Sequence, residues 1–269
     1  MNFEITDICE NIFDLNFEYG RVSGVFNNCF NIITEESKML TIFKKTQKFS
    51  TRALISNMEN INGIFDDMKV INKDKKIFID DFCFDYKNAR KIKTKREILN
   101  ISENIDENFL IFEDIIKPHL EKSPLFSEGI IKKKADEGFK KLYKNYKEGF
   151  KSLIGLGIGL TPSCDDVISG ISAYFYLCGK NYDFNFHLKD YLEKYGDKST
   201  TFVSKNLLYD TLNGYINDSV YNVIYSISKN KNDIKKYTLN LIDYGHSSGV
   251  ETCLGILKGY KMTKNKELI

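Results

Sequence analysis

The spacing of apolar residues changes character at about one third of the chain's length. Before that point, short runs rich in Val, Ile and Phe alternate with turn residues, which is typical of β-strands. The hairpin candidate Asn72-Lys73-Asp74-Lys75 separates two such runs. We therefore predict a small antiparallel sheet or partial barrel. Its expected strands lie within Arg21–Ile33, Met39–Lys44, Ala53–Asn57, Met68–Asn72 and Lys76–Ile79.

From about Glu103 onward, apolar residues recur at the spacing of α-helices, as in Phe109, Phe112 and Ile116. The fold class predicted for the whole chain is thus α+β. A β-rich domain is expected over residues 1–98 and an α-helical domain over 99–269. Several of the expected helices lie in the last hundred or so residues, over 163–178, 184–195, 200–216, 219–229, 233–244 and 248–261.

Composition narrows the class of protein. Apolar residues make up 42% of the chain, enough for a packed core. The formal net charge of +2, from 39 basic and 37 acidic residues, offers no electrostatic argument for binding nucleic acid or an anionic membrane. We expect a cytoplasmic protein, because no apolar run approaches the ~20 residues of a membrane span and the first residues do not resemble a signal peptide. Six scattered cysteines without a C-x-x-C pair indicate buried, reduced thiols.

The stretch 153–170 is the strongest candidate for chemistry. Gly155, Gly157 and Gly159 alternate with apolar residues and lead into Thr161-Pro162 and Ser163. Glycine permits positive φ and close approach of a ligand. Thr161 is a good N-cap and Pro162 suits the first helical position. We call residues 155–163 the glycine collar and expect it to hold an anion at the positive end of a helix dipole.

Two carboxylates, Asp165 and Asp166, follow the collar directly. Acidic residues in a first helical turn can simply complement the helix dipole. Their place behind the collar also leaves open Mg²⁺ binding or the orientation of a substrate amide. Neighbouring residues point about a third of a turn apart on a helix, so we expect at most one of the two to face a ligand.

A second motif covers residues 243–251. Gly245 resembles the residue that closes one helix, and Ser248 with Glu251 has the spacing of a capping box that opens the next. His246 would then lie in a glycine-flanked loop beside a helix start. A local capping role and a functional role, as general base or as donor to an oxyanion, are both open for this histidine.

A third motif is Ser199-Thr200-Thr201, which precedes another expected helix. Ser and Thr are common N-caps. Three hydroxyl groups in a row exceed what one cap requires, so some of them are candidates for ligand binding.

Common nucleotide motifs do not fit the collar. A Walker loop ends in Gly-Lys-Ser/Thr, whereas Leu160 follows Gly159 here, and a dinucleotide fingerprint needs G-x-G-x-x-G instead of G-x-G-x-G. The Gly-Leu-Gly-Ser-Ser phosphate loop of some small-molecule kinases begins like Gly155-Leu156-Gly157. That loop continues with small residues, unlike this one.

Taken in order, the collar with Asp165-Asp166, the segment 199–204 and the segment 245–249 resemble one bacterial family, the AllH-type subunit of oxamate carbamoyltransferase. The resemblance is close over about 150–260 and loose over the β-rich part. One position departs from the pattern: Cys164 stands where the family usually has glycine. A side chain there is expected to narrow the site, which puts the substrate in question.

The resemblance implies carbamoyl transfer between carbamoyl phosphate and oxamate, with oxalurate and phosphate on the other side of the reaction, in purine (allantoin) breakdown. It also implies a hetero-oligomer, so the chain alone need not be active. The Ser-x-Arg-Thr-Arg phosphate motif of aspartate and ornithine carbamoyltransferases is absent. Catalytic roles would fall to His246, Asp165 and Asp166. Binding of the small anionic substrate would fall to Gly155, Gly157, Gly159, Thr161, Ser163, Ser199, Thr200, Thr201, Ser247 and Ser248.

Two other functions remain open at this level. The collar would serve as a phosphate loop in a small-molecule kinase. Alternatively, the glycines would only pack helices together in a non-catalytic regulatory or scaffolding subunit.

Overall fold

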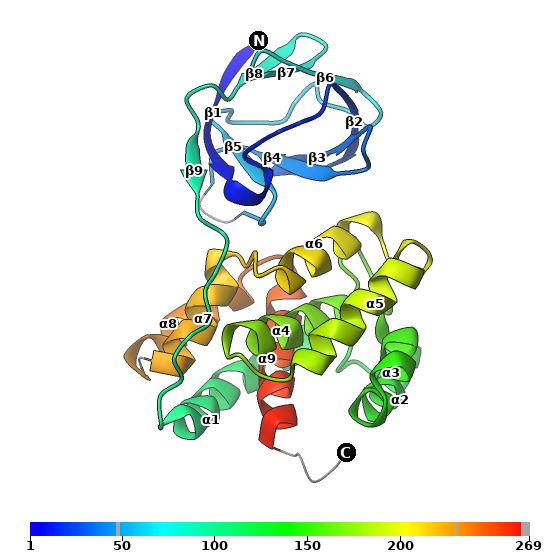
Figure 1. Ribbon diagram of the computed structural model, residues 1–269, viewed down its shortest axis with the longest axis vertical. Coiled ribbons are helices and arrows are strands. Elements are labelled where there is room, and N and C mark those ends of the chain that lie inside the picture. Colours follow the sequence, from blue (N-terminus) through cyan, green and yellow to red (C-terminus); the bar gives the residue numbers. More distant parts are fainter. Residues whose placement is uncertain (47–48, 230, 265–269) are drawn as a thin grey trace. The chain divides into compact units, whose positions relative to one another are not determined.

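The computed structural model describes residues 1–46, 49–229 and 231–264 (Figure 1). The chain divides into two compact units, Met1–Lys95 and Arg96–Ile269. The first is built from strands and the second from helices, which confirms the α+β class. Within the described ranges, no helix is both long and apolar enough to cross a lipid bilayer.

The described residues of the first unit form a nine-stranded sheet in the order β5-β4-β3-β2-β6-β7-β8-β1-β9. Because β1 also pairs with β5, the sheet closes on itself. A 3-10 turn, η1 (Glu10–Ile12), follows β1. The strands are β1 (Asn2–Cys9), β2 (Tyr19–Val25), β3 (Cys29–Thr34), β4 (Met39–Phe43), β5 (Ala53–Ser56), β6 (Lys69–Lys73), β7 (Lys76–Ile79), β8 (Phe82–Asp85) and β9 (Arg90–Ile92).

The sheet differs from the prediction in being mixed. Strand β1 runs parallel to β8 and to β9, and β4 runs parallel to β5. The predicted hairpin at 72–75 is present: β6 and β7 pair with Lys73 opposite Lys76, and Asp74 and Lys75 have φ of 52° and 61°. Positive φ at both central residues is the signature of a type I′ turn, whose twist suits a hairpin.

Period-two alternation places the core inside the closed sheet. Val70 and Ile77 are buried, while their neighbours Ile71 and Phe78 are exposed. The interior also holds Phe84, whose ring centroid lies 5.8 Å from that of Phe30.

The second unit is helical, with α4 as its most deeply buried element. Short 3-10 segments η2 (Lys117–Lys122) and η3 (Lys231–Asp233) join some of the helices. The helices are α1 (Ile105–Ile116), α2 (Ile130–Lys144), α3 (Tyr146–Leu153), α4 (Ser163–Leu177), α5 (Tyr182–Ser199), α6 (Phe202–Leu212), α7 (Asp218–Lys229), α8 (Ile234–Ile242) and α9 (Ser248–Lys264).

Glycines set the close packing of α4 against α9. A Cβ on Gly170 would lie 2.3 Å from the carbonyl oxygen of Thr252, and a Cβ on Gly255 would lie 2.1 Å from that of Val167. Any side chain at either position would push the two helices apart. This contact helps to hold the first turns of α4 and α9 beside each other.

Candidate functional site

The three glycines of the collar have positive φ, of 83° at Gly155, 140° at Gly157 and 96° at Gly159. At two of these positions, close packing also leaves no room for a side chain. A Cβ on Gly155 would lie 1.8 Å from the carbonyl oxygen of Ser199, and one on Gly157 would lie 2.2 Å from the backbone nitrogen of Ser163. Nothing lies within 4 Å of a Cβ built on Gly159. The collar is therefore held by close contacts at its start and has open space at its tip.

Asp165 connects the collar to the start of α6. Its carboxylate accepts hydrogen bonds from the backbone N–H of Gly155 at 2.7 Å, from Ser204 Oγ at 2.6 Å and from Thr200 Oγ1. The residue is 1% exposed. Burial raises the pKa of Asp165 above its ordinary value, and the three hydrogen bonds act in the opposite direction. Ser204 belongs to this network, although its place at the end of the segment 199–204 predicted no role for it.

The hydroxyl groups of the second and third motifs meet the collar. Thr161 Oγ1 lies 3.3 Å from Ser248 Oγ, and Thr201 Oγ1 donates to the carbonyl oxygen of Leu160. Thr201 also caps α6 by accepting from the N–H of Ser204 at 3.0 Å. The starts of α4, α6 and α9 thus lie together, and the structure brings the three sequence motifs into contact with one another.

The predicted cap of α4 is wrong by one residue. The helix begins at Ser163, and its N-cap is Pro162, which makes no side-chain cap. The backbone N–H groups of Asp165 and Asp166 bond instead to the carbonyl oxygen of Pro162. The Thr161 hydroxyl lies 3.3 Å from Ser248 Oγ and lowers the pKa of Asp166, so it interacts with the first turn of α4 through a side chain and not as its N-cap.

The three consecutive hydroxyl residues have separate roles. Ser199 ends α5, and its Oγ lies 3.0 Å from the hydroxyl oxygen of Tyr191. Thr200 is the C-cap of α5 and donates to Asp165, while Thr201 caps α6. The expected helix over 200–216 accordingly begins later, at Phe202.

Asp166 points to a different part of the site from Asp165. Its Oδ2 is enclosed and has no hydrogen-bond partner among the described residues. Burial raises the pKa of Asp166 well above its ordinary value, and the charge of Glu251 adds to that increase. The hydroxyl groups of Ser248 and Thr161 lower the pKa in part. Of the two adjacent aspartates, Asp166 is the one that retains an unused acceptor.

Glu251 does not complete a capping box as predicted. Its carboxylate accepts from Ser123 Oγ at 2.7 Å and from Ser247 Oγ at 3.3 Å, and the residue is 1% exposed. Ser248 is itself the first residue of helix α9, whereas a residue that caps the helix would precede its first residue. Ser123 was not foreseen as part of the site, because it is distant in sequence and belongs to no motif.

Two residues differ from their expected surroundings. His246 is exposed, and its ring forms no hydrogen bond with any residue in the described part of the chain. Cys164 is fully buried in the helical core, where burial raises the pKa of its thiol to about 12. Cys164 thus belongs to the helical core, against which Leu156 of the collar also packs, and the narrowing of the site by this residue stays a prediction.

The collar presents a run of free donors. Within the described residues, the five consecutive backbone N–H groups from Gly157 to Thr161 form no hydrogen bond. Three helix starts lie beside them, and each carries partial positive charge. Such an arrangement suits a small anion bearing a phosphate or carboxylate group. Across the described chain, no group of three or more His, Cys, Asp or Glu side chains is placed to hold a metal ion.

The collar and the two other motifs lie in the part of the chain that resembles a known family model. Residues 153–260 match the family model of oxamate carbamoyltransferase subunit AllH. The matched stretch includes the collar and both other motifs, which confirms the resemblance over that part of the chain. No solved structure matches this chain.

Proposed function

We propose that this chain is a subunit of an oxamate carbamoyltransferase and carries part of its active site. The observation that supports this most is the convergence of three motifs on Asp165 and on the Thr161–Ser248 contact. The reaction would transfer a carbamoyl group between carbamoyl phosphate and oxamate, with oxalurate and phosphate on the other side. Such a reaction would serve purine (allantoin) breakdown.

The collar would bind the anionic end of a substrate. Both substrates are anions, and the free N–H groups from Gly157 to Thr161 can donate to phosphate or carboxylate oxygens. The open space at Gly159 gives the anion room to approach the backbone. Hydroxyl groups of Thr161, Ser163 and Ser248 would add donors around the same point.

Asp166 would bind a substrate amide. Its enclosed Oδ2 lacks a donor, and an NH₂ group of oxamate or of the carbamoyl group supplies one. Asp165 would act as a positioning residue, because hydrogen bonds from Gly155, Thr200 and Ser204 already occupy its carboxylate. Each aspartate then has a distinct role, and neither role requires a metal.

His246 would accept the proton released in the reaction. The oxamate nitrogen attacks the carbamoyl carbon, a C–N bond forms, and the bond from that carbon to the phosphate oxygen breaks. Phosphate leaves with the bonding electrons, and the nitrogen loses one proton to an imidazole nitrogen of His246. Free N–H groups near the reacting carbon would stabilise the oxyanion of the intermediate.

Partner subunits would complete the site. His246 is exposed, and Ile158 at the tip of the collar is 70% exposed. Chemistry on carbamoyl phosphate benefits from exclusion of water, because water competes as a nucleophile. A second subunit placed over the collar would cover these residues.

The test is reconstitution with candidate partner subunits and an assay of oxalurate formation from carbamoyl phosphate and oxamate. We expect turnover by the complex and a loss of about a hundredfold or more in Asp166→Asn and His246→Ala complexes. Full activity of both variants would indicate a non-catalytic subunit. Calorimetry with ATP and magnesium tests the alternative of a small-molecule kinase. Binding of the nucleotide would favour the kinase, and no binding would exclude it.

A further inference from the structure

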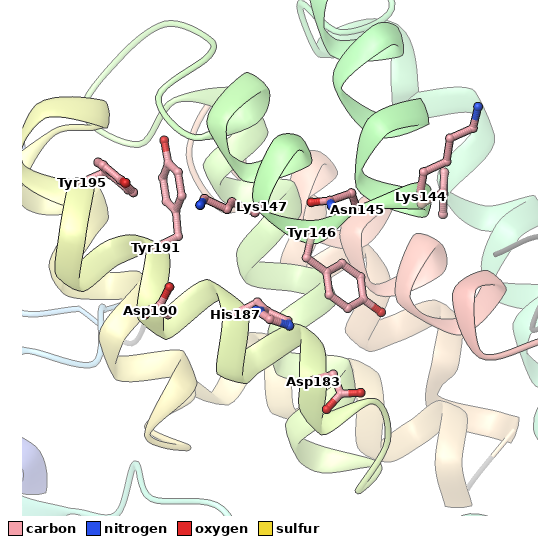
Figure 2. Close-up of a pocket in the computed structure, with 10 residues that line it drawn as sticks. Lys144, Asn145, Tyr146, Lys147, Asp183, His187, Asp190, Tyr191 and Tyr195 are labelled. Atoms are coloured by element: carbon pink, nitrogen blue, oxygen red, sulfur yellow. The ribbon is translucent and has the colours of Figure 1, made fainter.

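A groove separate from the three motifs lies between the α2–α3 junction and one face of α5 (Figure 2). Its volume is about 570 Å³, within the range of small-molecule sites. The α5 side is formed by residues spaced four apart, Asp183, His187, Tyr191 and Tyr195, which share one face of the helix. This groove has no role in the function proposed above.

Aromatic rings line the groove on both its α5 side and its α3 side. The rings of Tyr191 and Tyr195 have centroids 5.3 Å apart, and those of Tyr146 and His187 are 5.8 Å apart. The four rings therefore form two tilted pairs along the groove. Pairs of this kind present ring faces and edges that a flat aromatic ligand can contact.

The α3 side of the groove also carries positive charge. Lys147 extends toward Tyr191 in Figure 2 and forms no ion pair with any described residue. It lies in the first turn of α3, whose N-cap Asn145 accepts from the N–H of Glu148 at 3.1 Å. That cap leaves the N–H groups of Tyr146 and Lys147 free of partners within the described chain. A helix start and an unpaired ammonium group together favour an anion.

Two aspartates reduce this positive charge only in part. Asp190 lines the groove and pairs with Lys194 at 2.5 Å, so that ammonium group offsets its charge in part. Asp183 lies in the first turn of α5, where the dipole of that helix offsets its charge. The Lys147 ammonium group is thus left for a ligand.

We propose that this groove binds a small aromatic anion, with its ring against Tyr191 and Tyr195 and its charged group on Lys147. Such a ligand would contact Tyr191, whose hydroxyl oxygen lies 3.0 Å from Ser199 Oγ. The carbonyl oxygen of Ser199 in turn packs against Gly155 of the collar. Carboxylate and phosphate are both suitable as the charged group, so the ligand is defined by the combination of ring and charge.

The experiment titrates the full chain at low salt with indole-3-acetate and with AMP, and compares each with indole and with acetate. The protein contains no tryptophan, so an indole probe can be excited selectively at wavelengths that its 16 tyrosines do not absorb. We expect indole-3-acetate, AMP or both to bind at least about tenfold more tightly than indole or acetate. Binding of only one identifies the combination of ring and charged group that the groove accepts.

The variants then locate the site. Lys147→Ala should weaken binding about tenfold, as expected for loss of a charge-assisted hydrogen bond. The matched control is Lys151→Ala, one turn further along α3 and outside the groove. Tyr195→Ala should also weaken binding, by about fivefold. Equal effects of the two lysine variants, or no binding of either charged ligand at millimolar concentration, would overturn the proposal.

Discussion

Ser204 Oγ donates a hydrogen bond of 2.6 Å to the carboxylate of Asp165, which joins the first turn of α6 to the first turn of α4. The same carboxylate bonds to the backbone of Gly155. One buried side chain therefore fixes the collar relative to two helix starts. Both the stability of the helical unit and the position of the collar therefore depend on the carboxylate of Asp165.

Replacing Asp165 by Asn should destabilise the helical unit by about 1–3 kcal/mol. The carboxylate accepts hydrogen bonds at both oxygens, whereas Asn has an NH₂ donor at one of these positions, facing the hydroxyl groups of Thr200 and Ser204 that donate to Asp165. The measurement is the free energy of unfolding from urea titrations followed by circular dichroism. Asp114→Asn is the matched control, since that side chain is exposed on α1. Equal stability of the two variants would show that the Asp165 network contributes little.

Asp166→Asn should have the opposite effect on stability. Burial raises the folded-state pKa of Asp166, so the folded protein binds a proton more tightly than the unfolded chain does. Stability therefore falls as pH rises from the ordinary pKa of about 4 through the folded value. Asn removes this dependence, so the variant should be more stable than the original by about 1 kcal/mol or more at neutral pH.

The measurement is the free energy of unfolding of both proteins between about pH 3.5 and pH 8. The difference should shrink toward the acidic end, where Asp166 is protonated in both states. A difference that stays constant across this range would show that Asp166 does not titrate abnormally.

Alanine substitutions at two collar glycines separate an effect on folding stability from an effect on anion binding. Gly155→Ala should destabilise the helical unit by more than about 3 kcal/mol, because the new Cβ meets the carbonyl oxygen of Ser199 in addition to the strain of positive φ. Gly159→Ala has strain alone, about 1–2 kcal/mol. Its methyl group would occupy the space proposed for the anion, so the folded Gly159→Ala protein should bind phosphate at least about tenfold more weakly in calorimetry. Unchanged phosphate binding would place the anion elsewhere.

Ser123→Ala should destabilise the helical unit by about 1–3 kcal/mol, because it removes the 2.7 Å donor to the buried carboxylate of Glu251. The double variant Ser123→Ala with Glu251→Gln should cost less than the sum of the two single changes, since the residues interact. Additive costs in urea unfolding would show that the hydrogen bond is not coupled to stability.

The sequence could predict the elements of this protein better than their connections. Alternating apolar residues located most strands, and the hydroxyl and glycine motifs located the helix starts. The parallel neighbours of β1 were not predictable, because strand pairing over such separations leaves no local pattern. Ser123 was missed for the same reason: its partner Glu251 lies in a distant helix, and a lone serine carries no signal.

Cys164 allows the departure from the family pattern to be tested. The side chain is fully buried on the core side of α4, so the thiol should resist Ellman's reagent in the folded protein and react only on unfolding. Cys164→Gly, which restores the family residue, should destabilise the protein by about 2–3 kcal/mol through a cavity and the flexibility of a helical glycine. It should leave phosphate binding at the collar unchanged within about twofold, with Cys253→Ala as a second buried-thiol control. A large gain or loss of phosphate binding in Cys164→Gly alone would show that residue 164 shapes the site after all.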